Sequence, residues 1–413
     1  MRAWRFFTKT VKMFAFSEKD LFRNSNLRYT GSVSPYIRSF EKEYACDGLC
    51  KHVEQRPSDR AFRAPGLIAM PGCEELGQKV NNWLMKWYEQ QEALEDTPLF
   101  SLMGANRHDF LIEAHCPRFG TGEGKGMIKN SVRGYDIYIL TDIGAYNVTY
   151  KMYGREVPMS PDDHYQDLKR IIAAIGGRAK RVNVIMPMLY EGRQHRRTSR
   201  ESLDCALALQ ELEQMGVSNI ITFDAHDPRV QNAVPLIGFD SVKPSYQILK
   251  ALFRRECDLQ IDRDHLMIVS PDEGAIDRNI FYSSVLGIDM GLFYKRRDYT
   301  TVVDGRNPIM PMNTWRRCGR QGCVRLRRHP LLRRKHSGPG QGAQKAQGQP
   351  HLRRCYLRAL HQRAGAFDRA YEEGAISRII STNLTYRTPE LKQRPWFIEA
   401  DMSKYISYIV ASL

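Results

Sequence analysis

The sequence predicts an α/β protein in which helices cover parallel sheets. Short, fully apolar runs recur along the chain, as is typical of strands that are buried on both faces. Segments with helical periodicity lie between several of these runs, and this strand–helix–strand spacing is what parallel strands require. The chain has 413 residues, 42% of them hydrophobic, which excludes a wholly disordered protein and allows two or three domains.

The first predicted strand marks a change of pattern at Pro65. Residues 1–64 show no sustained periodicity, and we interpret them as an N-terminal extension. From Pro65 onwards, apolar runs suited to buried strands appear at regular intervals. We predict strands at residues 67–70, 110–114, 137–140, 182–188, 220–225, 267–270 and 288–293.

Three helices are predicted between these strands, at residues 73–88, 160–176 and 202–215. The second has the clearest signals, because Ser160 is a favourable N-cap and Pro161 suits the first helical position. Leu168, Ile171, Ile172 and Ile175 repeat at helical spacing, and Gly176 with Gly177 provides a C-terminal stop.

The net charge of +16 would ordinarily suggest a nucleic-acid partner. However, residues 305–367 hold fifteen Lys or Arg and no Asp or Glu, which leaves 47 basic and 46 acidic residues elsewhere. Nucleic acid is therefore not favoured. The nine dispersed cysteines are expected to be reduced, and no apolar run is long enough to span a membrane. We expect a cytoplasmic protein without membrane association.

A basic loop, 190–197, follows the predicted strand 182–188. Ligands bind at the carboxyl ends of strands in open α/β sheets. Arg193, Arg196 and Arg197 carry planar, forked donors that suit a polyphosphate. A solvated surface loop is the alternative interpretation of such a charge run.

The next predicted strand ends in Asp224-Ala225-His226. Alternating side chains lie on the same side of a strand, so a carboxylate and an imidazole could hold a divalent cation there. The alternative is that Asp224 caps a turn and His226 is a hydrogen-bonded histidine.

Two further strand ends carry charged residues. Asp272 and Glu273 follow strand 267–270, ahead of a helix start that could hold an anion, although a simple N-cap with a turn is the alternative. Residues 294–299 follow strand 288–293 and form a basic loop that could cover a triphosphate.

Taken in this order, these strand ends resemble the ribose-phosphate pyrophosphokinase family, whose members have two tandem phosphoribosyltransferase-like domains. Two earlier motifs resemble the same family: Arg118-Phe119-Gly120-Thr121-Gly122-Glu123 and Ser131-Val132-Arg133-Gly134-Tyr135-Asp136. The resemblance covers about residues 65–293 and returns near the C-terminus, at 367–371, 379–383 and 401–403.

The resemblance implies a role for individual residues. Phe119 would stack on the adenine of ATP, with Thr121 and Glu123 at its edge. Arg193 and Gln194 would also belong to the ATP site. His226 and Asp272 would be the metal-binding pair for Mg²⁺, and Lys295 and Arg297 the catalytic basic pair. Because the family builds its ATP site from two protomers, a homo-oligomer is implied. His195 stands where the family has Asp, and Glu273 and Asp277 also depart from its pattern.

The family's ribose 5-phosphate loop is absent, so no residue is assigned to that substrate. Residues 316–365 contain no Asp, Glu, Ile, Phe, Met, Asn, Thr or Trp, a composition that predicts no buried parallel strand. Family-like sequence returns abruptly at 366, and our hypothesis is a reading frame shifted between two compensating errors. The alternatives are a basic insertion that binds nucleic acid and a zinc site at Cys318, Cys323, His329 and His336.

We therefore predict an extension at 1–64, a phosphoribosyltransferase-like domain at 65–235 and a second one at 236–413, disrupted by the atypical segment 309–365. The implied reaction transfers diphosphate from ATP to ribose 5-phosphate, giving phosphoribosyl pyrophosphate and AMP. The chain as written is expected to be weakly active or inactive. The alternative function is a non-catalytic regulatory subunit, or pseudoenzyme, of the same family.

Overall fold

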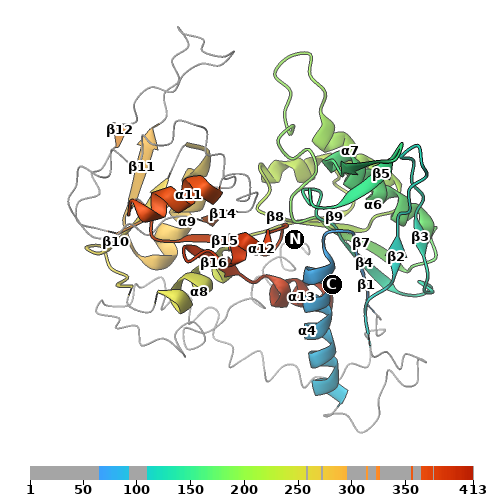
Figure 1. The fold of residues 1–413 in the computed structure, drawn as a ribbon, viewed down its shortest axis with the longest axis horizontal. Coiled ribbons are helices and arrows are strands. Elements are labelled where there is room, and N and C mark those ends of the chain that lie inside the picture. Colours follow the sequence, from blue (N-terminus) through green and yellow to red (C-terminus); the bar gives the residue numbers. More distant parts are fainter. Residues whose placement is uncertain are drawn as a thin grey trace.

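The computed structural model of the chain describes residues 65–92, 109–256, 259–270, 273–294, 313–314, 322–325, 355–356, 364–374 and 376–412. These residues form two α/β halves, which lie on the right and the left of Figure 1. Parallel strands and flanking helices make up both halves, so the predicted fold class is confirmed. Among the described residues, no helix is long and apolar enough to cross a membrane.

The first half is built on a five-stranded sheet in the order β1-β4-β7-β8-β9, and every neighbouring pair is parallel. Most of the residues in its central strands are fully buried, which explains their apolar composition. The strands are β1 (Pro65–Ala69), β4 (Asp136–Leu140), β7 (Arg181–Ile185), β8 (Asn219–Phe223) and β9 (Gly238–Val242).

Helices cover both faces of this sheet. One face packs against α6 (Pro161–Ile175) and α7 (Asp204–Gln214), and the other against α4 (Glu74–Glu92) and α13 (Ser403–Ser412). Successive residues of β4 alternate between the two cores, as the pleat of a strand requires. The final helix of the chain thus completes the core of the first half, and Figure 1 shows it beside α4.

Helix α6 begins as predicted. The Ser160 side chain accepts a hydrogen bond from Asp163 N, and the Asp163 side chain accepts one from Ser160 N, which completes a capping box. Gly176 ends the helix in a left-handed conformation, φ 57°, which glycine adopts without strain.

Two predicted strands end earlier than expected. β7 stops at Ile185 rather than at residue 188, because Pro187 has no N–H to offer a ladder. β8 stops at Phe223 rather than at residue 225, because Asp224 adopts a left-handed conformation, φ 55°. Both corrections turn predicted strand residues into loop residues at the carboxyl edge of the sheet.

The predicted strand 110–114 is also wrong in extent. Only Leu111 bridges β1, through its pairing with Leu67, and a short strand β2 (Ala114–His115) pairs with β3 (Met127–Ile128) instead. The reason is local: Phe110 N donates its hydrogen bond to the Asn81 side chain, so this N–H does not take part in a strand ladder. A hairpin, β5 (Thr149–Met152) and β6 (Arg155–Pro158), also lies outside the main sheet.

The second half contains two smaller sheets. One has the order β12-β11-β10-β13 and the other β14-β15-β16. Helices α8 (Ser245–Arg255) and α9 (Ile276–Leu286) share a core with β10, β15 and β16. The strands are β10 (Leu266–Ser270), β11 (Met290–Tyr294), β12 (Asn313–Thr314), β13 (Gly322–Arg325), β14 (Cys355–Tyr356), β15 (Ile379–Thr382) and β16 (Phe397–Ala400).

The atypical segment contributes two short parallel strands, whereas our expectation concerned buried strands, and the burial of these residues lies outside what the structure describes. β13 pairs in parallel with β10, and β14 pairs in parallel with β15. Both strands lie at the edge of their sheet, where one partner is sufficient and backbone groups make the ladder. The rest of residues 315–363, including Cys318, His329 and His336, lies outside the described residues.

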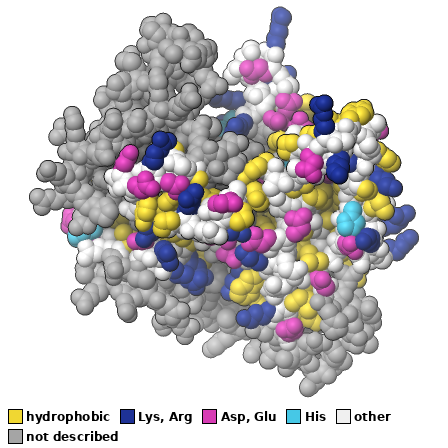
Figure 2. Space-filling model, viewed as in Figure 1, with side chains coloured by type: hydrophobic (Ala, Val, Ile, Leu, Met, Phe, Trp, Pro, Cys, Tyr) yellow, Lys and Arg dark blue, Asp and Glu magenta, His cyan; other side chains and the backbone are white. Residues whose placement is uncertain are grey.

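The remaining helices of the described chain close the second half. α11 (Ala364–Glu372) and α12 (Pro389–Lys392) enclose a small core around Phe367, Leu391 and Trp396. Figure 2 shows acidic and basic side chains interspersed over the described part of one face, in keeping with the near balance of charge outside residues 305–367.

Candidate ATP site at the strand ends

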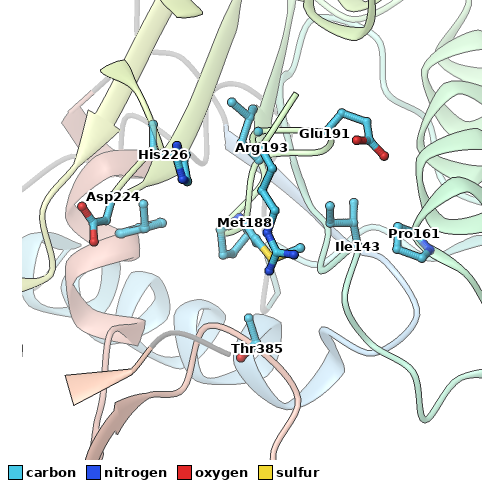
Figure 3. A pocket seen from close by; sticks show the side chains of 13 residues that line it. Ile143, Pro161, Met188, Glu191, Arg193, Asp224, His226 and Thr385 are labelled. Atoms are coloured by element: carbon cyan, nitrogen blue, oxygen red, sulfur yellow. The ribbon is translucent and has the colours of Figure 1, made fainter. Parts of the chain in front are cut away.

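A pocket of about 190 Å³ lies at the carboxyl edge of the five-stranded sheet, and we call it the strand-end pocket. The loops after β4, β7 and β8 provide most of its wall, and the start of α6 adds Pro161. The second half contributes Thr385, which follows β15 (Figure 3). Its lining residues are Ile143, Pro161, Pro187, Met188, Leu189, Glu191, Gly192, Arg193, Phe223, Asp224, Ala225, His226 and Thr385.

Arg193 and His226 meet at this pocket, as the strand-end motifs predicted. The close-up in Figure 3 shows the Arg193 side chain extending into the middle of the pocket, and the His226 imidazole on the side where Asp224 lies. An arginine is always charged and an imidazole can donate or accept, so the pair suits an anionic ligand with several oxygen atoms.

Backbone strain is concentrated in the pocket wall. Three non-glycine residues of the described chain have a positive φ, and two of them, Glu191 (φ 49°) and Asp224 (φ 55°), line the pocket. Such conformations cost free energy and persist only where the surrounding structure holds them. Their position here indicates a functional surface.

The carboxylate of Asp224 does not face the Arg193 guanidinium in Figure 3. It accepts a hydrogen bond of 2.7 Å from Arg278 Nη2, which comes from α9 in the second half. Both side chains are largely buried, with 12% and 15% of their surface exposed. This ion pair joins the two halves at the rim of the pocket.

A second acidic group stands behind His226. The Asp227 carboxylate lies 3.4 Å from His195 Nδ1 and is bound by the exposed Arg229 guanidinium. Hydrogen bonds from Arg229 outweigh partial burial and hold the pKa of the Asp227 carboxyl well below its usual range. The rings of His195 and His226 are 5.0 Å apart, so the residue that departs from the family pattern lies directly beside the pocket histidine.

The Gln194 side chain does not line the pocket with Arg193. Its side-chain amide donates to Ser202 O at 2.8 Å and so ties the basic loop to the residues that precede α7. In this conformation Gln194 is not part of the pocket wall.

The predicted adenine-binding residues lie together on a separate turn. Phe119 N donates to Glu123 O at 2.7 Å, and the Thr121 hydroxyl donates to the Glu123 carboxylate at 3.0 Å. The Phe119 ring is 55% exposed. None of the three lines the strand-end pocket of the same chain.

This turn is anchored by a buried ion pair. Arg118 Nη2 lies 2.8 Å from Asp167 Oδ2, and both side chains are at least nine-tenths buried. The Arg118 guanidinium also stacks on the Tyr150 ring of the β5–β6 hairpin, 4.7 Å from its centroid. Because the turn is held in place at Arg118 and its aromatic Phe119 is exposed, it is suited to present a flat ring to a ligand.

The described residues only partly test the predicted metal site. They contain no group of three or more His, Cys, Asp or Glu side chains that could hold a metal ion. His226 lines the pocket, whereas the Asp224 carboxylate is paired with Arg278. Asp272, Lys295 and Arg297, the other predicted residues, lie outside the described residues.

Sequence reasoning missed Thr385 and Arg278. Both come from the second half and reach the site only after the halves have docked. The signal for Thr385 was the pair of polar residues Asn383 and Thr385 shortly after the strand that ends at Thr382. The sequence offered no such signal for Arg278, which is a basic residue on the helix that follows Asp272.

Comparison with known proteins finds a match for most of the first half. Residues 67–216 match the family model described as the N-terminal domain of ribose phosphate pyrophosphokinase. This part of the chain is similar to that domain. The resemblance found in the sequence is thus confirmed for a domain that contains Phe119, Thr121, Glu123, Arg193 and Gln194.

Curated relatives carry the same name. Ribose-phosphate pyrophosphokinases from Oceanobacillus iheyensis and Mycoplasma genitalium are each 28% identical to this chain, over 196 and 212 residues. The alignments cover 46% and 51% of this chain and 55% and 61% of those proteins. The chain therefore matches little more than half of the length of these ribose-phosphate pyrophosphokinases.

A solved structure extends the likeness of the fold to both halves. The crystal structure of phosphoribosylpyrophosphate synthetase from Mycobacterium smegmatis superposes with a TM-score of 0.62 and covers 85% of this chain and 98% of its own. The sequences are 16% identical, so this match concerns the fold alone.

Proposed function

We propose that the strand-end pocket binds the phosphates of ATP, and that the fold serves the transfer of diphosphate from ATP to ribose 5-phosphate. The products would be phosphoribosyl pyrophosphate and AMP. The convergence of Arg193 and His226 at neighbouring strand ends carries the proposal, together with the match of residues 67–216 to the N-terminal domain of ribose phosphate pyrophosphokinase. Basic residues at such strand ends can align a polyphosphate and disperse its charge.

The proposed reaction needs little covalent chemistry from the protein. The 1-hydroxyl of ribose attacks the β-phosphorus of ATP and AMP departs, so charge stabilisation and alignment are the main requirements. Mg²⁺, which we propose His226 and Asp272 hold, would supply additional positive charge at the phosphates. Arg193 would bind the phosphates, while Lys295 and Arg297 would stabilise the group in transfer.

We further propose that the adenine-binding turn serves a neighbouring subunit. Phe119 is exposed, and Thr121 and Glu123 do not line the pocket of their own chain. A homo-oligomer would bring this turn to a second protomer's phosphate-binding loops. The proposed setting is the cytoplasm, where ATP is abundant and where thiols such as Cys73, Cys116 and Cys205 stay reduced.

We also propose domain boundaries after residues 64 and 235. The first sheet itself continues to β9, which ends at Val242. The second domain would carry ribose 5-phosphate, but residues 309–365 lack the family's acidic strand end and phosphate loop. For this reason the chain as written is proposed to have weak catalytic activity or none.

A coupled assay of AMP release with ATP and ribose 5-phosphate tests the activity. We expect little release from this chain, and restored release after residues 309–365 are replaced with family-like sequence. Failure of the repaired chain to bind ATP with Mg²⁺, measured by calorimetry, would refute the proposed site. Sequencing the gene across codons 305–370 tests the frameshift hypothesis, which an intact frame would contradict.

A second candidate is a non-catalytic regulatory subunit. The observation that favours it is the presence of the strand-end pocket in a chain whose residues 309–365 lack the family's ribose phosphate loop. This function predicts that the unaltered chain binds ATP without turnover and changes the rate of an active ribose-phosphate pyrophosphokinase mixed with it. An unchanged rate in the mixture would argue against it.

A further inference from the structure

The ion pair between Asp224 and Arg278 links the pocket wall to the opposite half of the molecule. Asp224 directly follows β8 of the five-stranded sheet, whereas Arg278 lies near the start of α9, which packs on β10. The 2.7 Å bond between them is largely shielded from water. A charged hydrogen bond in such surroundings is stronger and more directional than one on the surface.

Asp224 begins the turn that carries His226. Its backbone is left-handed, φ 55°, a conformation that residues with a side chain seldom adopt. Two bonds to β9 hold the backbone of this turn, because Asp224 N donates to Val242 O at 2.9 Å and Ala225 N donates to Ser241 Oγ at 3.0 Å. The Asp224 side chain, by contrast, is held by the second half.

We propose that Arg278 is a positioning residue for the strand-end pocket. By holding the Asp224 carboxylate from the second half, it fixes the strained turn and so sets the position of the His226 imidazole at the pocket wall. The pocket is then fully formed only while the two halves are docked. This inference rests on the proposed binding of ATP, and it adds the residue that couples that site to the second half.

The proposal differs from the idea that Asp224 is itself a cation ligand. If Asp224 served only to hold Mg²⁺, removal of the competing Arg278 would leave binding intact or tighten it. If Asp224 acts through the turn, loss of either member of the pair weakens binding. Loss of both then adds little, because the two substitutions remove the same interaction.

The first experiment is a double-mutant cycle on the full-length chain. Magnesium and a non-hydrolysable ATP analogue are titrated by calorimetry into wild type, Arg278→Gln, Asp224→Asn and the double variant. We expect each single variant to bind about tenfold more weakly, with the double variant no weaker than the singles. Arg278→Lys keeps the charge and should recover part of the affinity.

Arg378→Gln is the matched control. It removes a comparable ion pair, 2.6 Å between Arg378 Nε and Glu256 Oε1, which lies within the second half and away from the pocket. Its affinity for the analogue should equal that of wild type. Equal losses in Arg378→Gln and Arg278→Gln would assign the effect to general stability and overturn the proposal.

The second experiment does not depend on ATP. In protein labelled with ¹⁵N-histidine, the ring signals of His226 should shift in Arg278→Gln and in Asp224→Asn. Those of His164, whose Nε2 lies 3.0 Å from Ala145 O in the core of the first half, should stay in place. An unshifted His226 signal would refute the positioning role, whereas a shifted signal in a protein that binds no ATP would refute only the proposed function.

Discussion

Arg193 is the residue on which the proposed phosphate site most depends. It lines the strand-end pocket from the loop after β7, and Figure 3 shows its guanidinium within the cavity. Charged hydrogen bonds are worth about 1.5–3 kcal/mol each. We therefore expect Arg193→Ala to weaken the binding of ATP with Mg²⁺ by roughly 10- to 100-fold, as measured by calorimetry.

Arg178→Ala is the control for this prediction. Arg178 is an exposed arginine between α6 and β7, at the opposite edge of the same sheet. The same loss of charge there should leave affinity for ATP unchanged. If both variants bound ATP equally well, Arg193 would have no role in phosphate recognition.

Sequence could identify the site residues that follow a strand of their own sheet. Arg193 and His226 come directly after buried apolar runs, and the carboxyl ends of parallel strands meet at one edge. It could not identify Arg278 or Thr385, because their places depend on docking of the second half. Nor could it predict that Gln194 would turn back to Ser202.

At the scale of elements, the capping box of α6 should contribute measurably to stability. Ser160→Ala removes the hydrogen bond to Asp163 N and leaves a donor of the first helical turn without its cap. We expect a loss of about 1 kcal/mol in the free energy of unfolding, measured by urea denaturation. Ser160→Asn, which retains a capping side chain, should lose much less, and equal losses would rule out the capping role.

Helix α4 supports a pH-dependent contact with the C-terminal region. Glu75 lies 2.7 Å from Lys392 of α12 and 3.0 Å from Lys79. Burial would raise the pKa of Glu75, but the hydrogen bonds from the two lysines prevail and lower it from 4.5 to about 2. Because the folded-state pKa is depressed, the stabilisation is present above pH 4.5 and is lost as pH falls from 4.5 towards 2.

Glu75→Gln should therefore destabilise the protein modestly at neutral pH and make its stability less dependent on pH between about 4.5 and 2. The effect should shrink in high salt, because the Glu75 side chain is half exposed. Thermal unfolding as a function of pH measures it. Glu89→Gln, an exposed position on the same helix, is the control, and an identical pH profile for both variants would contradict the prediction.

Most elements of the first half could be predicted because their periodicity and caps agree. Helix α6 illustrates this, since N-cap, apolar repeat and C-terminal glycine all point to the same bounds. β9 was missed because all five of its residues are only half buried, so no apolar run marks it. β13 and β14 were missed because edge pairing uses backbone groups, which composition does not report.

At the scale of the whole molecule, the two halves share a hydrophobic core. Ile406 of α13 is fully buried in the cluster that contains Leu76 and Val80 of α4. Ile406→Ala should cost about 2–5 kcal/mol and should destabilise the first half, although it lies near the C-terminus. Hydrogen exchange of the β1 and β4 amides measures whether the loss of stability reaches the first half.

Ile280→Ala is the matched control for this prediction. Ile280 is on α9 and is 47% exposed, so its removal leaves no comparable cavity. We expect near-wild-type stability. Unaltered exchange of β1 and β4 in Ile406→Ala would show that the shared core does not support the first half.

The seam between α4 and α13 has a consequence for synthesis of the protein. The ribosome produces α4 early and α13 last, so one face of the first sheet has no cover until nearly the whole chain has been translated. A nascent chain that stopped within residues 309–365 would expose that apolar face of the sheet to chaperones and proteases. Translation through residues 309–365 to α13 therefore matters for survival of the N-terminal domain in the cell, quite apart from any catalysis.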